Sequence, residues 1–69
     1  MEKIRVFING KENFLDSNIN ILSLLQQLNL KPERVAVEVN KNVIPKEDFE
    51  EYILRDGDKI EIVRFVGGG

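Results

Sequence analysis

A short alternating segment followed by an Asn-Gly step constrains the fold of this chain more than any other feature. In residues 3–8 every second side chain is aliphatic, which is the period of a strand with one buried face. Asn9-Gly10 follows directly, and both residue types tolerate the positive φ angles of a two-residue type I′ turn. A second strand is expected over residues 11–15. The sequence therefore predicts a β-hairpin at the start of the chain.

One helix is predicted after the hairpin. Residues 16–20 are mainly polar, and apolar side chains then recur at helical spacing, at Ile21, Leu24, Leu25 and Leu28. Asn20 is the expected N-cap, because its side-chain oxygen can accept a hydrogen bond from a free amide of the first turn. Lys31-Pro32 is expected to end the segment, since proline disfavours a helical residue before it. The predicted helix has about nine residues.

The second half of the chain contains two further strand patterns and an irregular acidic segment. Val35–Val39 alternate as a third strand, and Val43-Ile44 form a short strand that Pro45 places at a sheet edge. Residues 46–54 are predicted to form a single helical turn packed over the end of the sheet. Its expected apolar anchors are Phe49, Tyr52 and Ile53.

A tight turn is predicted at residues 55–58, leading into a last strand over residues 59–66. Within this turn, Asp56-Gly57-Asp58 lacks the further oxygen ligands and the distal glutamate of a calcium loop, so a plain turn is the preferred interpretation. The acidic side chains of residues 47–51 are interpreted as solvated surface rather than as paired catalytic carboxylates.

The composition of this 69-residue chain excludes several classes of function. Histidine and cysteine are both absent, which removes the commonest general base, thiolate nucleophiles, disulfides and cysteine-rich zinc sites. A self-contained enzyme is therefore not expected. Ten basic against twelve acidic residues give a net charge of −2, which argues against nucleic-acid binding. Apolar runs are too short for a signal sequence or a membrane span, so we expect a cytoplasmic protein.

Three apolar side chains on the predicted strands point away from the core. They are Phe7 on the first strand and Val63 and Phe65 on the last. If these two strands are neighbours, the three residues form an exposed apolar patch, which usually marks an interaction site. The alternative is that loops, or the segment from Phe49 to Leu54, cover them.

The chain given ends in three glycines, Gly67, Gly68 and Gly69. They carry no side chain to pack and have high backbone entropy, so residues 1–66 are expected to form the domain and residues 67–69 a flexible tail. An ordinary frayed terminus and a linker are two interpretations of this tail. The third is that the terminal carboxylate is the reactive group and the glycines form a slim arm that enters a narrow channel in a partner.

Five segments in this order resemble one known family. They are Asn20–Leu25, Val35–Asn40, Val43–Lys46, Asp56–Ile62 and Val66–Gly69. Together they resemble the bacterial sulfur carriers of thiamine biosynthesis, the ThiS family. The resemblance implies an α+β, ubiquitin-like β-grasp fold, with a mixed sheet of four to five strands and one main helix packed on one face.

The resemblance also implies a chemistry without catalytic side chains, bound metal or bound cofactor. A partner adenylating enzyme, related to ubiquitin-activating enzymes, would use ATP and magnesium to convert the Gly69 carboxylate to an acyl-adenylate. Sulfur supplied through a cysteine desulfurase would then give a thiocarboxylate for thiazole synthase. Gly67 and Gly68 would enter the partner active site, and Phe7, Val63 and Phe65 would form the docking patch. Sulfur delivery to molybdopterin or another acceptor, and a non-covalent ubiquitin-like interaction module, stay open as alternatives.

Overall fold

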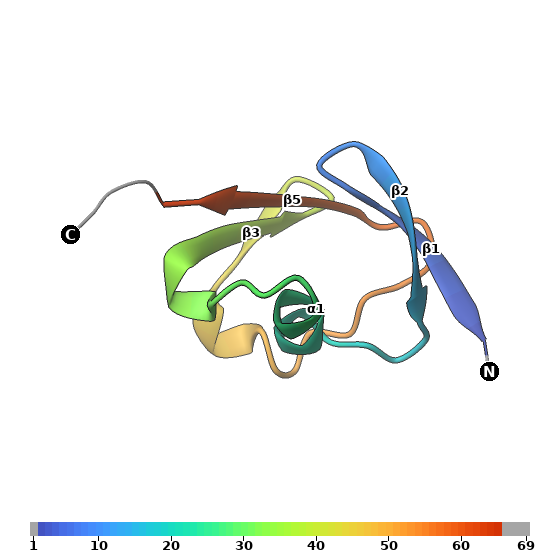
Figure 1. The fold of residues 1–69 in the computed structure, drawn as a ribbon, viewed down its shortest axis with the longest axis horizontal. Coiled ribbons are helices and arrows are strands. Elements are labelled where there is room, and N and C mark those ends of the chain that lie inside the picture. Colours follow the sequence, from blue (N-terminus) through green and yellow to red (C-terminus); the bar gives the residue numbers. More distant parts are fainter. Residues whose placement is uncertain (1, 66–69) are drawn as a thin grey trace.

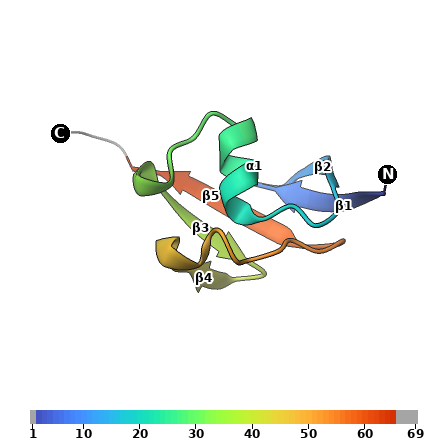
Figure 2. The ribbon, with the colours of Figure 1, turned by 90° about the horizontal axis from the view of Figure 1, so that it is seen from below.

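The computed structural model describes residues 2–65. These residues form five strands, one α-helix and two short 3-10 turns. The elements are β1 (Lys3–Ile8), β2 (Lys11–Asp16), α1 (Ile21–Gln27), η1 (Pro32–Arg34), β3 (Val35–Val39), β4 (Asn42–Ile44), η2 (Lys46–Asp48) and β5 (Lys59–Arg64). The strand order is β2-β1-β5-β3-β4, with β1 and β5 parallel and the other neighbours antiparallel. Helix α1 crosses one face of this sheet (Figure 1, Figure 2). The expected β-grasp architecture is confirmed.

The opening hairpin forms as predicted. Ile8 pairs with Lys11, so that Asn9 and Gly10 make a two-residue turn with φ angles of 50° and 85°. These positive values explain why the turn needs this dipeptide. Strand β2 continues to Asp16, one residue beyond the predicted end.

Asn9 also joins the hairpin to β5 through its side chain. Regular β1–β5 pairing ends at Ile8 opposite Ile60. Beyond that point the Asn9 side-chain oxygen accepts from the Ile62 amide at 2.8 Å, and its side-chain nitrogen donates to the Ile62 carbonyl at 3.1 Å. The side chain of Asn9 thus continues the ladder where the backbone of β1 turns away.

Helix α1 begins as expected and ends earlier than expected. Its N-cap is Asn20, whose side-chain oxygen accepts from the Ser23 amide at 2.7 Å. The helix has seven residues, because Asn29 adopts a left-handed conformation with φ of 59°. The Leu30 amide donates to the Leu25 carbonyl at 2.9 Å, which completes a Schellman-type end. The prediction that Lys31-Pro32 ends the helix is wrong, and Pro32 instead begins η1.

The segment between β4 and β5 packs mostly as predicted. It contains the single helical turn η2, followed by Phe49, which is buried. Tyr52 is partly buried against the core. Ile53 is 42% exposed, however, and Leu54 is buried in its place, so the predicted anchor at Ile53 is wrong. The Leu54 amide donates to the Ile19 carbonyl, which fixes Leu54 inward beside the start of α1.

The core lies between α1 and one face of the sheet. Seven of its side chains are no more than 1% exposed: Val6, Ile21, Leu24, Leu25, Val37, Val39 and Ile60. The predicted turn before β5 is confirmed, with Gly57 at a φ of 89°. Asp58 is buried and accepts from the Arg55 amide and the Asn40 side chain, so its carboxylate closes the turn.

Candidate functional site

The predicted site consists of the glycine arm and the docking patch. Gly67, Gly68 and Gly69 lie outside the described residues, as does Val66 at the predicted end of the last strand. The structure therefore describes the strand that leads to the glycine arm, and the chain after it as far as Phe65. That strand, β5, is the middle strand of the sheet, between β1 and β3 (Figure 1).

Strand β5 is held along its whole length. From Ile60 to Arg64 it pairs with β3, and on its other side it pairs with the end of β1 and with the Asn9 side chain. Past the strand, the Phe65 amide donates to the Arg34 carbonyl at 2.9 Å. Backbone hydrogen bonds therefore fix the chain up to the residue before Val66.

Val63 and Phe65 form an exposed pair on the face of the sheet opposite α1. Their exposed fractions are 60% and 62%, while Ile60 and Ile62 face the core. Residues 49–54 were the predicted alternative cover, but the Phe49 carbonyl accepts from the Leu22 amide on the helix side of the molecule. Within the described residues, this pair is open to a partner.

Phe7 is not next to this pair, although β1 and β5 are neighbours as the patch required. The register places Phe7 beside Lys59, four residues before Val63, which corresponds to about 13 Å along the strand. Phe7 is half-buried, and the Arg5 guanidinium carbon lies 5.5 Å from its ring centroid. The structure thus brings together Val63 and Phe65 and sets Phe7 apart from them.

The outward face carries two further apolar residues that sequence reasoning did not single out. Val63 of β5 lies opposite Ala36 of β3. Two residues along β3, on the same face, Glu38 lies opposite Val43 of the edge strand β4. Val43 is 69% exposed. On the other edge, Phe14 is 63% exposed on β2. The alternation in Val35–Val39, which turns Ala36 outward, is the signal that could have revealed the extension toward β4.

No group of three or more acidic, histidine or cysteine side chains within residues 2–65 is placed to hold a metal ion. The carboxylates of the predicted solvated segment, Glu47, Asp48, Glu50 and Glu51, are all exposed. None of the helices described is long and apolar enough to cross a membrane.

Comparison with known proteins identifies the family. The ThiS family model matches residues 2–69. This chain belongs to the ThiS family. A sulfur carrier protein ThiS from Bacillus subtilis (strain 168) is 44% identical over 63 residues, covering 90% of this chain and 96% of that protein. The crystal structure of a ThiS thiamine biosynthesis protein from Geobacter metallireducens superimposes with a TM-score of 0.80 at 35% identity, covering 96% of this chain and 100% of that one.

Another relative of this chain is much longer. A thiazole synthase from Paramagnetospirillum magneticum is 38% identical to this chain over 66 residues. The match covers 96% of this chain but only 20% of that protein. The chain therefore spans about a fifth of the length of this relative, which is named a thiazole synthase.

Proposed function

We propose that this protein is the sulfur carrier of thiamine biosynthesis and that its reactive group is the Gly69 carboxylate. The observation that carries the proposal is membership of the ThiS family over residues 2–69, which includes the glycine segment. The B. subtilis relative, matched over nearly its full length, bears the name of a sulfur carrier. The protein is a substrate of its partners and has no catalytic side chain of its own.

The chemistry of a carboxylate explains why partners are needed. A terminal carboxyl group has a pKa of about 3.5, so it is an anion at neutral pH and a poor electrophile. An adenylating enzyme that uses ATP and magnesium would let a carboxylate oxygen attack the α-phosphorus, with loss of pyrophosphate. A persulfide, formed from cysteine through a desulfurase, would then attack the acyl carbon with its outer sulfur and expel AMP, which leaves an acyl disulfide. A thiol would cleave the S–S bond of this acyl disulfide, forming a new disulfide with the inner sulfur and releasing the thiocarboxylate. The product that donates sulfur is the Gly69 thiocarboxylate.

The docking surface has to compensate for ordering the glycine arm. Immobilising three residues costs about 3–6 kcal/mol, at 1–2 kcal/mol for each backbone. Full burial of a large apolar side chain contributes about 1.5–3 kcal/mol. Because Val63 and Phe65 are 60% and 62% exposed, their docking can add about 2–4 kcal/mol together. The half-buried Phe7 has less surface left to bury. The free energy gained by docking Val63 and Phe65 is thus of the same order as the cost of ordering the glycine arm.

Thiazole synthase is the proposed sulfur acceptor. The thiazole synthase from P. magneticum contains a segment similar to 96% of this chain, which supports a functional association of the two units. Delivery to molybdopterin or another acceptor is the alternative within the carrier class. A competition pull-down with thiazole synthase and molybdopterin synthase would separate them, and preferential capture of the second would contradict the proposed acceptor.

The carrier function is tested by ATP–pyrophosphate exchange with the cognate adenylating enzyme. The full chain is expected to support exchange, and a variant that lacks Gly68 and Gly69 is expected to lose it. The thermal midpoint of the shortened variant should equal that of the full chain, because the two deleted glycines have no side chains to bury. No exchange with the full chain, or undiminished exchange without the two glycines, would contradict the proposal. A non-covalent ubiquitin-like module would give the first of these results.

A further inference from the structure

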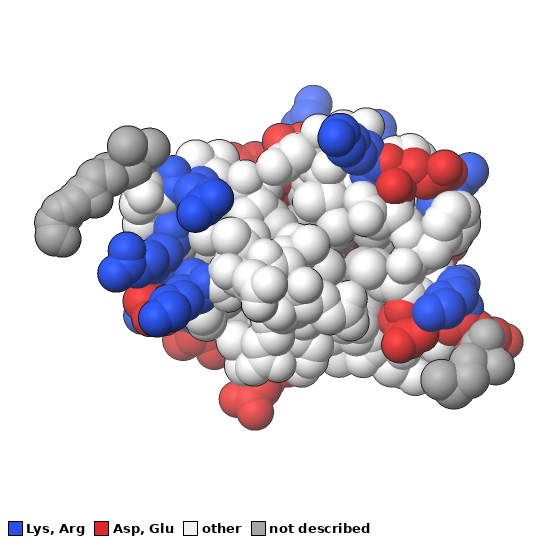
Figure 3. All heavy atoms as spheres, in the orientation of Figure 1, with Lys and Arg blue, Asp and Glu red and all other residues white. Residues whose placement is uncertain are grey.

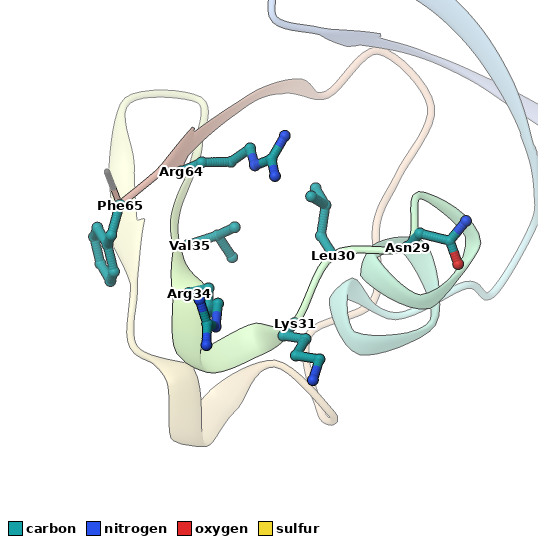
Figure 4. Close-up of a pocket in the computed structure, with 7 residues that line it drawn as sticks. All are labelled: Asn29, Leu30, Lys31, Arg34, Val35, Arg64 and Phe65. Carbon is teal, nitrogen blue, oxygen red and sulfur yellow. The ribbon is translucent and has the colours of Figure 1, made fainter. Parts of the chain in front are cut away.

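Three basic side chains lie together where β5 ends. Lys31, Arg34 and Arg64 line a shallow hollow of about 270 Å³, whose walls include Leu30 and Val35. Figure 4 shows Arg64 reaching across the hollow toward Leu30, while the Phe65 ring turns away from it. We call these three cations the basic collar. Figure 3 shows basic side chains gathered at this end of the molecule.

The backbone holds the basic collar in place. Arg64 lies opposite Val35 in the β3–β5 ladder, and the Arg34 carbonyl accepts from the Phe65 amide at 2.9 Å. The Arg34 amide in turn donates to the Lys31 carbonyl at 2.9 Å, within the turn that η1 makes. Three residues separated by up to 33 positions in the sequence therefore carry their charges on one fixed frame.

The charges of the basic collar have no counter-ion within the described part of the chain. The salt bridges found there are Lys3–Asp16 and Arg5–Glu12, both on the β1–β2 hairpin. All three collar residues are exposed, in a chain whose net charge is −2. Like charges held side by side repel one another and do not stabilise the fold. Their placement is instead suited to a negatively charged partner.

We propose that the basic collar docks against acidic residues around the mouth of the protein channel that receives the glycine arm. This inference rests on the proposed function. A protein surface fits better than a small anion, because the three cations are exposed and none is a buried group aimed into an enclosed site. The collar lies on the α1 side of the end of β5, and the exposed Val63 and Phe65 lie on the opposite face, so that charged and apolar surfaces flank this end on its two sides (Figure 4). In a partner that encloses the end of β5, the collar would contribute to the charged rim that protein interfaces carry around their apolar contacts.

A rim of this kind acts mainly on the rate of encounter. Complementary charges raise association rates by about 10- to 1000-fold at low salt, and salt removes the effect. The collar would therefore guide the end of β5 toward the channel before the apolar pair makes contact. Dissociation, governed by the buried contacts, should depend on it little.

The test measures association of the full chain with its cognate adenylating enzyme by stopped flow at several salt concentrations. The collar variant carries Lys31→Gln, Arg34→Gln and Arg64→Gln. The matched control carries Lys11→Gln, Lys41→Asn and Arg55→Gln, which removes the same charge from exposed residues at the start of β2, in the β3–β4 turn and in the turn before β5. Asparagine replaces Lys41 because the φ angle there is 72°.

We expect the collar variant to associate about tenfold more slowly than the control at low salt. The difference should vanish at about 0.5 M salt, where the Debye length is only about 4 Å. A third variant, Arg34→Lys with Arg64→Lys, keeps the charge and should match the wild type. Thermal midpoints of all variants establish that each one is folded.

Equal association of the collar variant and the control at every salt concentration would overturn the collar proposal alone. If the wild type supports no pyrophosphate exchange, the proposed function fails instead. Inorganic pyrophosphate is the probe for a small-anion site. NMR shifts confined to the collar, saturating at micromolar pyrophosphate in the free protein, would overturn docking to a protein rim in favour of anion binding.

Discussion

Replacing Asn9 with glycine isolates the contribution of one side chain to the strand that carries the glycine arm. The substitution keeps the positive φ of 50° that the turn requires, because glycine adopts it without strain. It removes the two hydrogen bonds, of 2.8 and 3.1 Å, to the backbone of Ile62. The amide and carbonyl of Ile62 then lose their partners on the β1 side of β5.

The expected loss follows from those two bonds. A hydrogen bond contributes about 0.5–1.5 kcal/mol net, so the pair should lower the free energy of unfolding by about 1–3 kcal/mol. For a domain of this size, a loss of about 2 kcal/mol lowers the melting midpoint by about 8–16 °C. Glycine also destabilises by raising the entropy of the unfolded chain, and this part needs a control.

Asn18→Gly provides that control. Asn18 also has a positive φ, of 68°, but its side chain makes no hydrogen bond to the other residues described. Urea unfolding of both variants, with matched slopes, should place Asn18→Gly within about 0.5 kcal/mol of the wild type and Asn9→Gly about 1–3 kcal/mol below it. Equal stability of the two variants would refute the role assigned to the Asn9 side chain.

Three further substitutions test the helix, the core and the docking pair. Asn20→Ala removes the N-cap and should cost about 1 kcal/mol in urea unfolding, and an unchanged midpoint would contradict the capping bond. Leu25→Ala empties a fully buried site and should cost about 2–5 kcal/mol in the same assay, whereas a loss below 1 kcal/mol would mean that the site collapses. Phe65→Asp should weaken adenylating-enzyme binding in a titration by at least about tenfold and change stability by less than about 0.5 kcal/mol. Comparable losses in both would place Phe65 in the core.

Elements with a local cause were predictable from the sequence. The Asn9-Gly10 turn, the Asn20 cap and the alternating strand Val35–Val39 each depend on interactions within a few residues. The helix end was also a local event, but its signal was weaker. Asn29 takes a left-handed conformation less readily than glycine, so Pro32 looked like the stronger stop.

Features that depend on distant contacts were not predictable. The buried anchor is Leu54 and not the predicted Ile53. Both residues lie in an irregular segment without the repeat spacing of a helix or a strand, so the sequence does not indicate which of the two side chains faces the core. The separation of Phe7 from Val63 depends on the β1–β5 register, which no turn sets because 50 residues lie between the two strands. The basic collar joins Lys31 at the N-cap of η1, Arg34 within η1 and Arg64 of β5, which only the fold brings together.

The identity of the modified atom is the central claim, and intact-mass spectrometry tests it most directly. The full chain is incubated with its adenylating enzyme, ATP, magnesium, a desulfurase and cysteine. We predict a mass increase equal to the replacement of one oxygen atom by sulfur, located by fragmentation on Gly69. An unchanged mass, under conditions in which the same enzyme converts a known carrier, would contradict the account, as would sulfur found on any other residue.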